Sequence, residues 1–474
     1  MLNIIVEFIL ARRAMVLAVL IAFLGTGAYT FHRLNIEAYP DPAPPYMEII
    51  SQNAGQSAEE IERYISIPIE IAMAGMPGLQ NIRSTSLYGL SDVRVQFSYD
   101  TEYKSALQEV LNRLSTLAGL PSGVQPSISG VSPIGEICRY QIIGPPGCSL
   151  TDLKTLQDWV VEKRFRTIPG VVDITGWGGL TKQYHVDVEL EKLTAYHIPL
   201  SQVVTAISNS NMNVGASTLD LGQQSANVRG LGLIRSLDDL DNIVLTQQNG
   251  TPVLLKDVAR PEIGHTQRLG IAGRDNDPDV VFGTILMRRG SKTLEVLGRV
   301  EAAIEDMNHS NILPAGVQIK PYYNRRDLIG VTTHTVLHNL VFGLALIFLI
   351  QFLFLGDLRS AIVVCASIPF ALFFSAMIMY LKGDSANLLS VGSIDFGIIV
   401  DATVIMVENI FRRLAEGDGH LGKRHKILSG ATEVGSSVFF STAIIIAAFL
   451  PLFTMQGVEG QIFGPMAQTY GYAM

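Results

Sequence analysis

Three acidic side chains interrupt the apolar stretch GSIDFGIIVDATVIMVENIFRRL, which runs from Gly392 to Leu414. These acids are Asp395, Asp401 and Glu408. A carboxylate at the centre of a bilayer costs at least about 2.5 to 3.5 kcal/mol on insertion scales, so acids in such a stretch need a reason. A carboxyl group poised between desolvation and a nearby cation can exchange its proton near neutral pH. The stretch therefore predicts a proton-transfer site.

The spacing of the acids predicts how they face. Asp401 and Glu408 are seven residues apart, so a helix places them about 20° apart around its axis and roughly 10 Å apart along it. Asp395 precedes Asp401 by six residues and lies about 120° away. We therefore expect Asp401 and Glu408 to share a face, and Asp395 to point toward a neighbouring helix or another part of the same cavity.

A structural role is the alternative for these acids, because buried carboxylates can also pair with polar groups and hold helices together. This alternative is strongest for Glu408, which lies within one turn of Arg412 and Arg413 and could pair with them at the membrane interface. It is weakest for Asp401, near the middle of the stretch.

Composition places the acids in a membrane protein. Of 474 residues, 48% are hydrophobic and only 16% are charged, against about 25% charged in soluble domains. Five stretches approach the roughly 20 residues that cross a bilayer, and a sixth begins near Phe463. The five cover residues 15–31, 340–355, 361–381, 392–414 and 436–453. The net charge of -8 is diffuse, which argues against a nucleic-acid partner.

Basic residues predict the orientation of these spans. If the spans alternate, one side carries Arg12, Arg13, Arg359, Arg412, Arg413, Lys423, Arg424 and Lys426, whereas the opposite short loops offer only Lys382. The side rich in Lys and Arg is cytoplasmic by the positive-inside rule. No small-residue cleavage site follows the first span, so we do not expect a cleaved signal peptide. We expect a multi-pass membrane protein with residues 35–330 on the outer side of the membrane, which is the periplasm if the cell is Gram-negative.

The outer segment contains an internal repeat. In residues 59–97 and again in 152–188, an amphipathic helix pattern ends at a Pro-Gly pair and an alternating strand pattern follows. The pairs are Pro77-Gly78 and Pro169-Gly170. The repeat predicts two ferredoxin-like modules of split βαβ topology. Chance is the alternative, because helix ends attract Pro and Gly anyway. Between the halves of the second module, residues 190–264 predict an inserted β-rich subdomain.

Three motifs together resemble one protein family. The stretch DFGIIVDATVIMVENIFRRL, together with PIEIAMAGMPGLQNIRSTSLYGLSDVRVQF and YYNRRDLIGVTTHTVLHNL, is similar to the resistance-nodulation-division (RND) proton-driven efflux permeases. Within that family the resemblance is to the N-terminal half of the heavy-metal branch, of the cobalt-zinc-cadmium and copper-silver type. It implies a secondary active transporter, not an enzyme, that exports metal cations by proton antiport.

The resemblance also implies roles for the acids. Asp401 matches the central proton-relay aspartate of the family, Asp395 the additional acid of divalent-metal exporters, and Glu408 with Asn409 a shared pair that follows. The drug-exporting branch has a second adjacent aspartate where this chain has Ala402. These matches favour metal over hydrophobic drugs as the substrate.

The identity of the metal is less defined. Met406 fits one methionine step of copper and silver exporters, but Ile399 stands at another, and soft ions need soft ligands. Zinc, cobalt, nickel or cadmium is therefore the better expectation. His334 and His338 have the i, i+4 spacing of a metal-binding pair, although a helix feature of the family is the alternative. No metal-ligand set is assigned, and no cofactor is expected.

The resemblance implies the domain plan of a polytopic α-helical membrane domain with an α+β periplasmic domain. Residues 1–34 would form the N-terminal cytoplasmic segment and first span, and 331–474 the later spans. The periplasmic ranges would be 35–135 for the first porter module, 136–189 and 265–330 for the second, and 190–264 for the docking subdomain. The implied partners are a periplasmic adaptor and an outer-membrane channel, with the full-length protein a homotrimer.

Two other functions remain open at this stage. One is an RND exporter of drugs or other hydrophobic compounds. The other is a relative that does not export, either a membrane-anchored periplasmic interaction module or a proton-driven secretion motor. The inserted subdomain favours export, because RND exporters use it to meet the outer-membrane channel.

The predicted orientation can be tested by labelling introduced cysteines in a variant that lacks the native ones. A cysteine near Gly230 should react with an impermeant maleimide from the periplasmic side. One near Gly422 should react only after the inner membrane is opened. Labelling of both positions from the same side would contradict the orientation.

Overall fold

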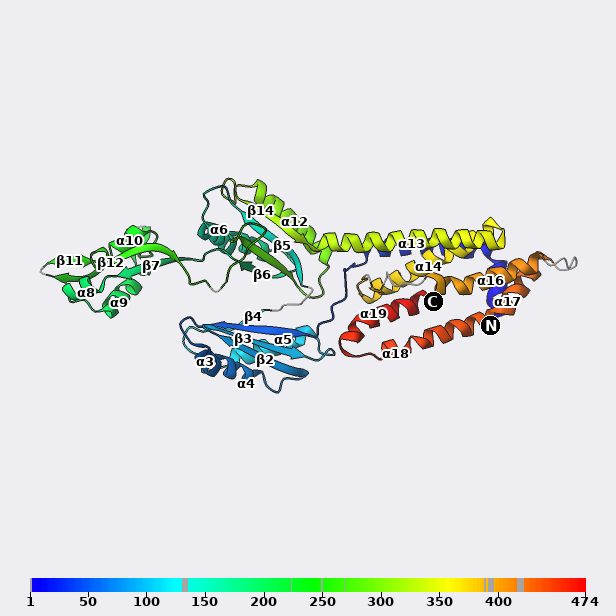
Figure 1. Cartoon of the computed structure of the whole chain (residues 1–474), viewed down its shortest axis with the longest axis horizontal. Helices are drawn as coiled ribbons and strands as arrows, with labels where there is room; N and C mark the ends of the chain where they lie inside the picture. Colours follow the sequence, from blue (N-terminus) through cyan, green and yellow to red (C-terminus); the bar gives the residue numbers. More distant parts are fainter. Residues whose placement is uncertain are drawn as a thin grey trace.

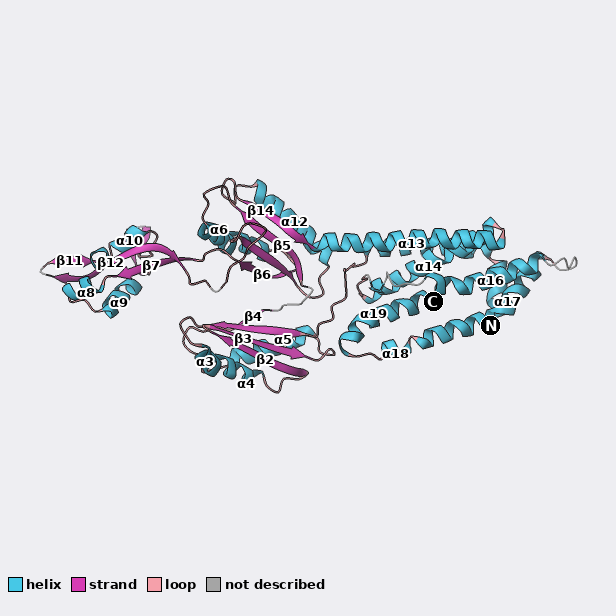
Figure 2. Ribbon diagram, viewed as in Figure 1, coloured by secondary structure: helices cyan, strands magenta, loops and turns pink. Residues whose placement is uncertain are grey.

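The structure, a computed structural model, describes residues 2–129, 135–222, 224–248, 250–268, 270–387, 389–390, 396–415 and 422–474. Figure 1 shows an elongated molecule with a helical bundle at one end and three α/β lobes extending from it. Both ends of the chain lie in the bundle. All the described strands lie in the lobes (Figure 2). The expected combination of apolar helices with a β-containing domain is confirmed.

The bundle is built from the first two helices and from the helices that follow residue 324. They are α1 (Leu2–Ala11), α2 (Arg13–Arg33), α13 (Arg325–Leu355), α14 (Leu358–Lys382), α16 (Phe396–Ala415), α17 (Lys423–Ala448), α18 (Leu450–Phe453) and α19 (Gly457–Ala473). Among the described residues, four segments are long and apolar enough to cross a membrane: Arg13–Arg33, Arg325–Leu355, Leu358–Lys382 and Lys423–Phe453. These correspond to four of the five predicted spans.

The remaining predicted span corresponds to α16, a helix of 20 residues that carries two acids and two arginines. The helix is long enough to cross a membrane, but because of these four charges it is not among the four segments that are apolar enough. The helices α2, α13, α14 and α17 are also longer than the apolar runs predicted for them. In particular, α13 has 31 residues and so extends about 46 Å, well beyond its apolar part.

Local sequence signals set the ends of these helices. Asn324 caps α13 by accepting a hydrogen bond from the backbone N–H of Arg326 at 2.9 Å. Asp357 caps α14 in the same way through Ser360 at 2.9 Å. Gly356 and Gly383 follow α13 and α14 with φ of 63° and 78°, the left-handed conformation that favours glycine. The turn between α13 and α14 is therefore short and well defined.

The helix α14 is the centre of the bundle. It packs against α2, α13, α16 and α19. Many of its buried residues are small, including Ala361, Ala371, Ser375 and Ala376. Small side chains let helices approach closely within a membrane. The helix α2 approaches α14 closely at Gly27, where an added Cβ would lie 2.5 Å from Phe373 Cβ.

The first α/β lobe, module 1 (residues 46–129), is a four-stranded antiparallel sheet with helices on one face. Its strand order is β2-β3-β1-β4. The strands are β1 (Tyr46–Gln52), β2 (Leu79–Leu87), β3 (Leu90–Phe97) and β4 (Ser127–Ser129). A helical segment made of α3 (Ala58–Ile61), a π-helical turn η1 (Glu62–Ser66) and α4 (Ile67–Met73) joins β1 to β2, and α5 (Tyr103–Thr116) joins β3 to β4. Alternating residues of β1 and β3 form its core with these helices.

Module 2 (residues 136–177 and 281–324) repeats this arrangement. Its sheet order is β14-β5-β13-β6, from strands β5 (Glu136–Ile143), β6 (Val171–Trp177), β13 (Val281–Met287) and β14 (Gln318–Asn324). Its helices are α6 (Leu150–Leu156), the π-helical turn η2 (Gln157–Val161), α7 (Glu162–Arg166) and α12 (Thr293–His309). The two sheets have the same order when strands are matched by position in the chain. Both first helices also contain a π-helical turn, so the predicted internal repeat is present in the structure.

A distal lobe (residues 182–265) is inserted between β6 and β13. Its strands form three antiparallel pairs, β7 (Lys182–Val188) with β12 (Ala259–His265), β8 (Val214–Leu221) with β9 (Gln224–Gly230), and β10 (Val244–Gln248) with β11 (Thr251–Leu254). The helices α8 (Leu190–Ala195), α9 (Leu200–Ser210), α10 (Leu237–Asp241) and α11 (Leu255–Val258) contribute to a separate core. The β-rich character predicted for this segment is thus accompanied by helices.

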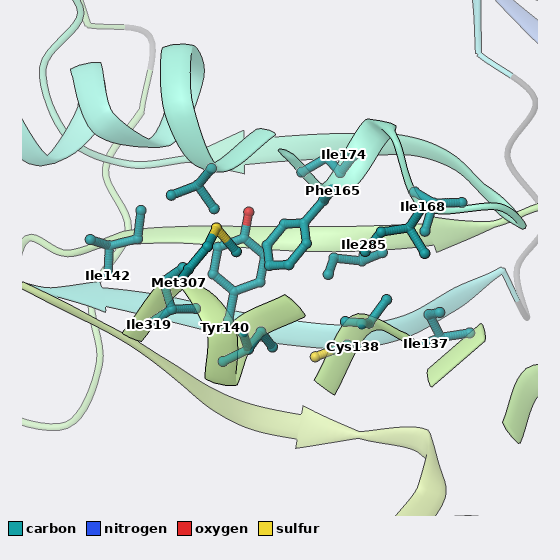
Figure 3. Close-up of a cluster of buried hydrophobic side chains, with 14 of the residues drawn as sticks. Ile137, Cys138, Tyr140, Ile142, Phe165, Ile168, Ile174, Ile285, Met307 and Ile319 are labelled. Atoms are coloured by element: carbon teal, nitrogen blue, oxygen red, sulfur yellow. The ribbon is translucent and has the colours of Figure 1, made fainter. Parts of the chain in front are cut away.

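The core of module 2 contains an aromatic residue packed over a glycine. Tyr140 is fully buried, donates a hydrogen bond to Gln157 Oε1 at 2.9 Å and meets Phe165 edge to face (Figure 3). Its cross-strand partner is Gly283. A Cβ added at Gly283 would lie 2.3 Å from Tyr140 Cζ, so the ring occupies the space that a side chain would need.

Gly283→Ala should therefore destabilise module 2 by about 1 to 3 kcal/mol, because the added methyl group overpacks the core. Gly298→Ala is a matched control, since an added Cβ there meets only Arg326 Nη2 at 3.6 Å. This control should be neutral or stabilising by up to about 1 kcal/mol, because alanine favours the helix. Hydrogen exchange of the β5 and β13 amides in the full-length protein measures both effects. Equal exchange in the two variants would contradict the packing argument.

Candidate functional site

The acids that the structure describes in residues 392–414 lie on one uncovered face of α16. Asp401, Ile405 and Glu408 are exposed, at the spacing of a single helical stripe. Val400 lies on the covered side and packs with Val364 and Ile368 of α14. Asp401 and Glu408 thus share a face, as their spacing predicts. Asp395 lies outside the described residues.

The side chains of Asp401 and Glu408 form no hydrogen bond or ion pair with any other residue that the structure describes. The sequence offers Arg412 and Arg413 as ion-pair partners for Glu408. In the structure both arginines contact Glu433 of α17 instead. Within the described part of the chain, the two acids therefore do not act as pairs that hold helices together. They are available to groups that approach this face of α16.

A polar network on the neighbouring face of α16 fixes the helix against α17. Asn409 is buried and donates hydrogen bonds to the backbone oxygen of Gly430 at 2.8 Å and to Glu433 Oε2 at 3.1 Å. Arg413 Nε donates to the same Glu433 oxygen at 3.0 Å, and Arg412 donates to Asn409 Oδ1 at 2.8 Å. A buried amide side chain that is hydrogen-bonded in this way fixes the rotation of its helix about the helix axis. This network therefore leaves Asp401 and Glu408 uncovered on the face beside the contact with α17.

The contact between α16 and α17 is also close. An added Cβ at Gly430 would lie 3.1 Å from Ile410 Cα, so the absence of a side chain lets the two backbones approach. The sequence indicates Asn409 through its place beside Glu408, but not Glu433, which is 24 residues away from it. A lone acid that follows a basic cluster is a weak signal for this contact.

The possible metal ligands are dispersed. His334 and His338 lie on exposed positions of α13, with ring centroids 6.3 Å apart. Met406 lies half-buried on α16. Among the described residues, no three His, Cys, Asp or Glu side chains come together in a way that could hold a metal ion. No metal-ion site is therefore assigned within the described residues.

Comparisons with known proteins agree with the arrangement of helices and lobes. The sequence model of the AcrB/AcrD/AcrF family matches residues 5–474. Protein HelA of Legionella pneumophila is 38% identical over 99% of this chain and 46% of its own length. Cobalt-zinc-cadmium resistance protein CzcA of Cupriavidus metallidurans is 36% identical with the same two coverages, 99% and 46%. Cation efflux system protein CusA of Escherichia coli is 34% identical over 94% of this chain and 44% of its own length.

A crystal structure described as a heavy metal efflux pump superimposes with a TM-score of 0.90 at 40% identity. It covers 99% of this chain and 46% of its own chain. The chain thus spans about half the length of the relatives that it matches.

Asn409→Ala should loosen the contact between α16 and α17, because it removes the amide that donates hydrogen bonds to Gly430 O and to Glu433. We expect a loss of roughly 1 to 2 kcal/mol. Titration of the full-length protein with sodium dodecyl sulfate in mixed micelles measures the unfolding free energy. Glu408→Gln is the neighbouring control, because Glu408 is exposed, and it should change that free energy little. A smaller effect of Asn409→Ala than of the control would contradict the network.

Proposed function

Because the chain belongs to the AcrB/AcrD/AcrF family, we propose that it is the N-terminal half of a proton-driven permease that exports heavy-metal cations by antiport. Protons would move past Asp401 in the bundle, and the resulting shift of helices would move the α/β lobes. The lobes would then pass the cation outward. Asp395, Asp401 and Glu408 would form the relay, with Asp401 as its central group.

The uncovered acidic stripe of α16 carries this proposal. Exposed Asp401 and Glu408 sit on a helix whose other faces pack against α14 and α17. An unpaired carboxylate facing hydrocarbon is costly, so this face needs a polar cover or a water-filled cavity. The rest of a full-length permease would supply that cover, since the relatives are about twice as long as this chain. A relay formed between two halves follows naturally from such an arrangement.

The substrate follows from the relatives and from the residues of α16 together. The names of similar proteins include cobalt, zinc, cadmium and nickel. Ala402 stands where drug exporters have a second aspartate. Ile399 stands where copper and silver exporters have a methionine. A divalent cation, zinc, cobalt, nickel or cadmium, is therefore the proposed cargo.

The lobes suggest how the permease would be assembled. Modules 1 and 2 share one strand order, which supports two ferredoxin-like porter modules of split βαβ topology. The distal lobe has its own core and stands farthest from the bundle (Figure 1), a position suited to docking on an outer-membrane channel. We place the lobes in the periplasm and the bundle in the inner membrane. The complex would be a homotrimer with a periplasmic adaptor.

Asp401→Asn should reduce metal export to below about a tenth of the wild-type rate, because asparagine keeps the size and polarity but cannot exchange a proton. Asp395→Asn should weaken transport or change the preferred metal, and Glu408→Gln should have a smaller effect. The experiment uses the full-length permease in vesicles with an imposed pH gradient and records metal flux and proton movement together. Wild-type flux in Asp401→Asn would refute the relay.

A further inference from the structure

A polar cluster lies where the helical bundle meets module 2. The segment that leaves α2 forms a parallel bridge with the segment that follows α14. Ala386 N donates to Asn35 O at 2.8 Å, and Glu37 N donates to Ala386 O at 2.7 Å. Two connections of the bundle are thus joined to each other directly beside module 2.

The side chain of Glu37 extends this junction into module 2. Only 7% of Glu37 is exposed, and its Oε1 accepts a hydrogen bond from Thr293 Oγ1 at 2.6 Å. Asn35 Nδ2 donates to the same oxygen at 3.4 Å. Thr293 is fully buried and is the first residue of α12. A single carboxylate therefore connects the exit of α2 with the start of a module 2 helix.

An arginine holds the other side of the cluster. Arg325 is 2% exposed and is the first residue of α13. It donates to the Tyr39 hydroxyl at 2.6 Å, and its guanidinium lies 5.0 Å from the centroid of the Tyr39 ring. Its charge also stabilises the carboxylate of Glu37. The helix α13 thus begins in contact with the segment that ends α2.

Such a cluster is costly to build, which makes its location informative. A buried charge destabilises a protein unless it is paired and hydrogen-bonded, and apolar residues of the same volume often serve stability equally well. Here the two buried charges stand where α12 and α13 begin and where α2 has just ended. Stability alone does not account for that placement.

We propose that Glu37 and Thr293 are positioning residues of a joint that fixes the exit of α2 and the segment after α14 to α12 of module 2. Arg325 adds the start of α13 to the same joint. A displacement of the bundle helices then moves module 2 as one piece. This last step rests on the proposed transport function, whereas the joint itself does not.

A cavity of about 240 Å³ lies beside Glu37. The charged and titratable groups around Glu37 are Arg325 of α13, Tyr39 and Asp41 of its own segment, and Arg289 from the turn before α12. The segment after α14 contributes Ser385 to the cavity, and its Asp384 lines the neighbouring one.

Burial raises the pKa of Glu37 above its ordinary value of 4.5, and the contacts with Thr293 and Arg325 oppose this rise only partly. The folded joint therefore retains the Glu37 proton to a higher pH than the unfolded chain does. The stability contributed by this group is fully present below the ordinary pKa and is lost as pH rises through the raised value. Glu37→Gln keeps an acceptor oxygen but cannot ionise, so it should flatten this pH dependence.

Thr293→Val tests the joint, because it keeps the shape of the side chain and removes the hydroxyl donor. Hydrogen exchange of the Glu37 and Ala386 amides in the full-length protein should become about tenfold faster. Thr293→Ser keeps the hydroxyl and should restore slow exchange. Thr332→Val is the matched control, since Thr332 is also buried and, among the residues that the structure describes, its hydroxyl donates to the Leu328 carbonyl of its own helix. This control should leave exchange at the joint unchanged.

Transport by the same variants tests whether the joint transmits motion. Thr293→Val should lower the maximal rate of metal export at least about fivefold with little change in KM. The Thr293→Ser and Thr332→Val variants should transport nearly as the wild type does.

The two measurements separate the possible failures. Unchanged exchange in Thr293→Val, or an unaltered pH dependence in Glu37→Gln, overturns the joint whatever the transport result. Faster exchange with a wild-type export rate overturns the positioning role. If the wild-type permease carries no metal, the proposed function fails, and exchange alone still decides whether these segments are joined through Glu37.

Discussion

Close packing around α14 is the interaction on which the helical part depends. A helix in hydrocarbon gains no hydrophobic stabilisation from meeting another helix, so contact must come from shape and from polar groups. The small residues of α14 let α2, α13, α16 and α19 approach it together. This packing leaves one face of α16 free and places Asp401 on it. The candidate relay is therefore a consequence of which face α14 occupies.

Polar groups act in two places, on α16 and at the junction between the bundle and module 2. On α16, Asn409 and Glu433 fix the rotation of the helix, while Asp401 and Glu408 remain without partners among the described residues. At the junction with module 2, Glu37 and Arg325 are buried and in contact with several segments. The contrast is chemical: groups that hold position are hydrogen-bonded to neighbouring segments, whereas a group proposed to exchange protons must be left available.

Sequence reasoning succeeded where the signal is local and periodic. The seven-residue spacing of Asp401 and Glu408 predicted a shared face, and the two Pro-Gly pairs predicted the repeated modules. It was less successful with lengths, because the apolar run of residues 340–355 marks only part of α13. Polar turns at the start of α13 are helical because Asn324 caps them and because Arg325 and Ile329 are buried. Contacts such as Thr293 with Glu37, far apart in the chain, leave no pattern in either segment.

The position of the distal lobe has an evolutionary consequence. In module 1, β2 and β3 are neighbours joined by a tight turn at Tyr88-Gly89, whereas the matching strands of module 2, β6 and β13, are joined through the whole lobe. Trp177 and Phe282 still pair across that opening, so the two ends of the insertion remain adjacent. The entropic cost of closing a loop grows only slowly with its length, and a lobe with its own core adds little further cost. A hairpin tip is therefore a permissive place for a whole folding unit, because the strands on both sides of it still pair with each other.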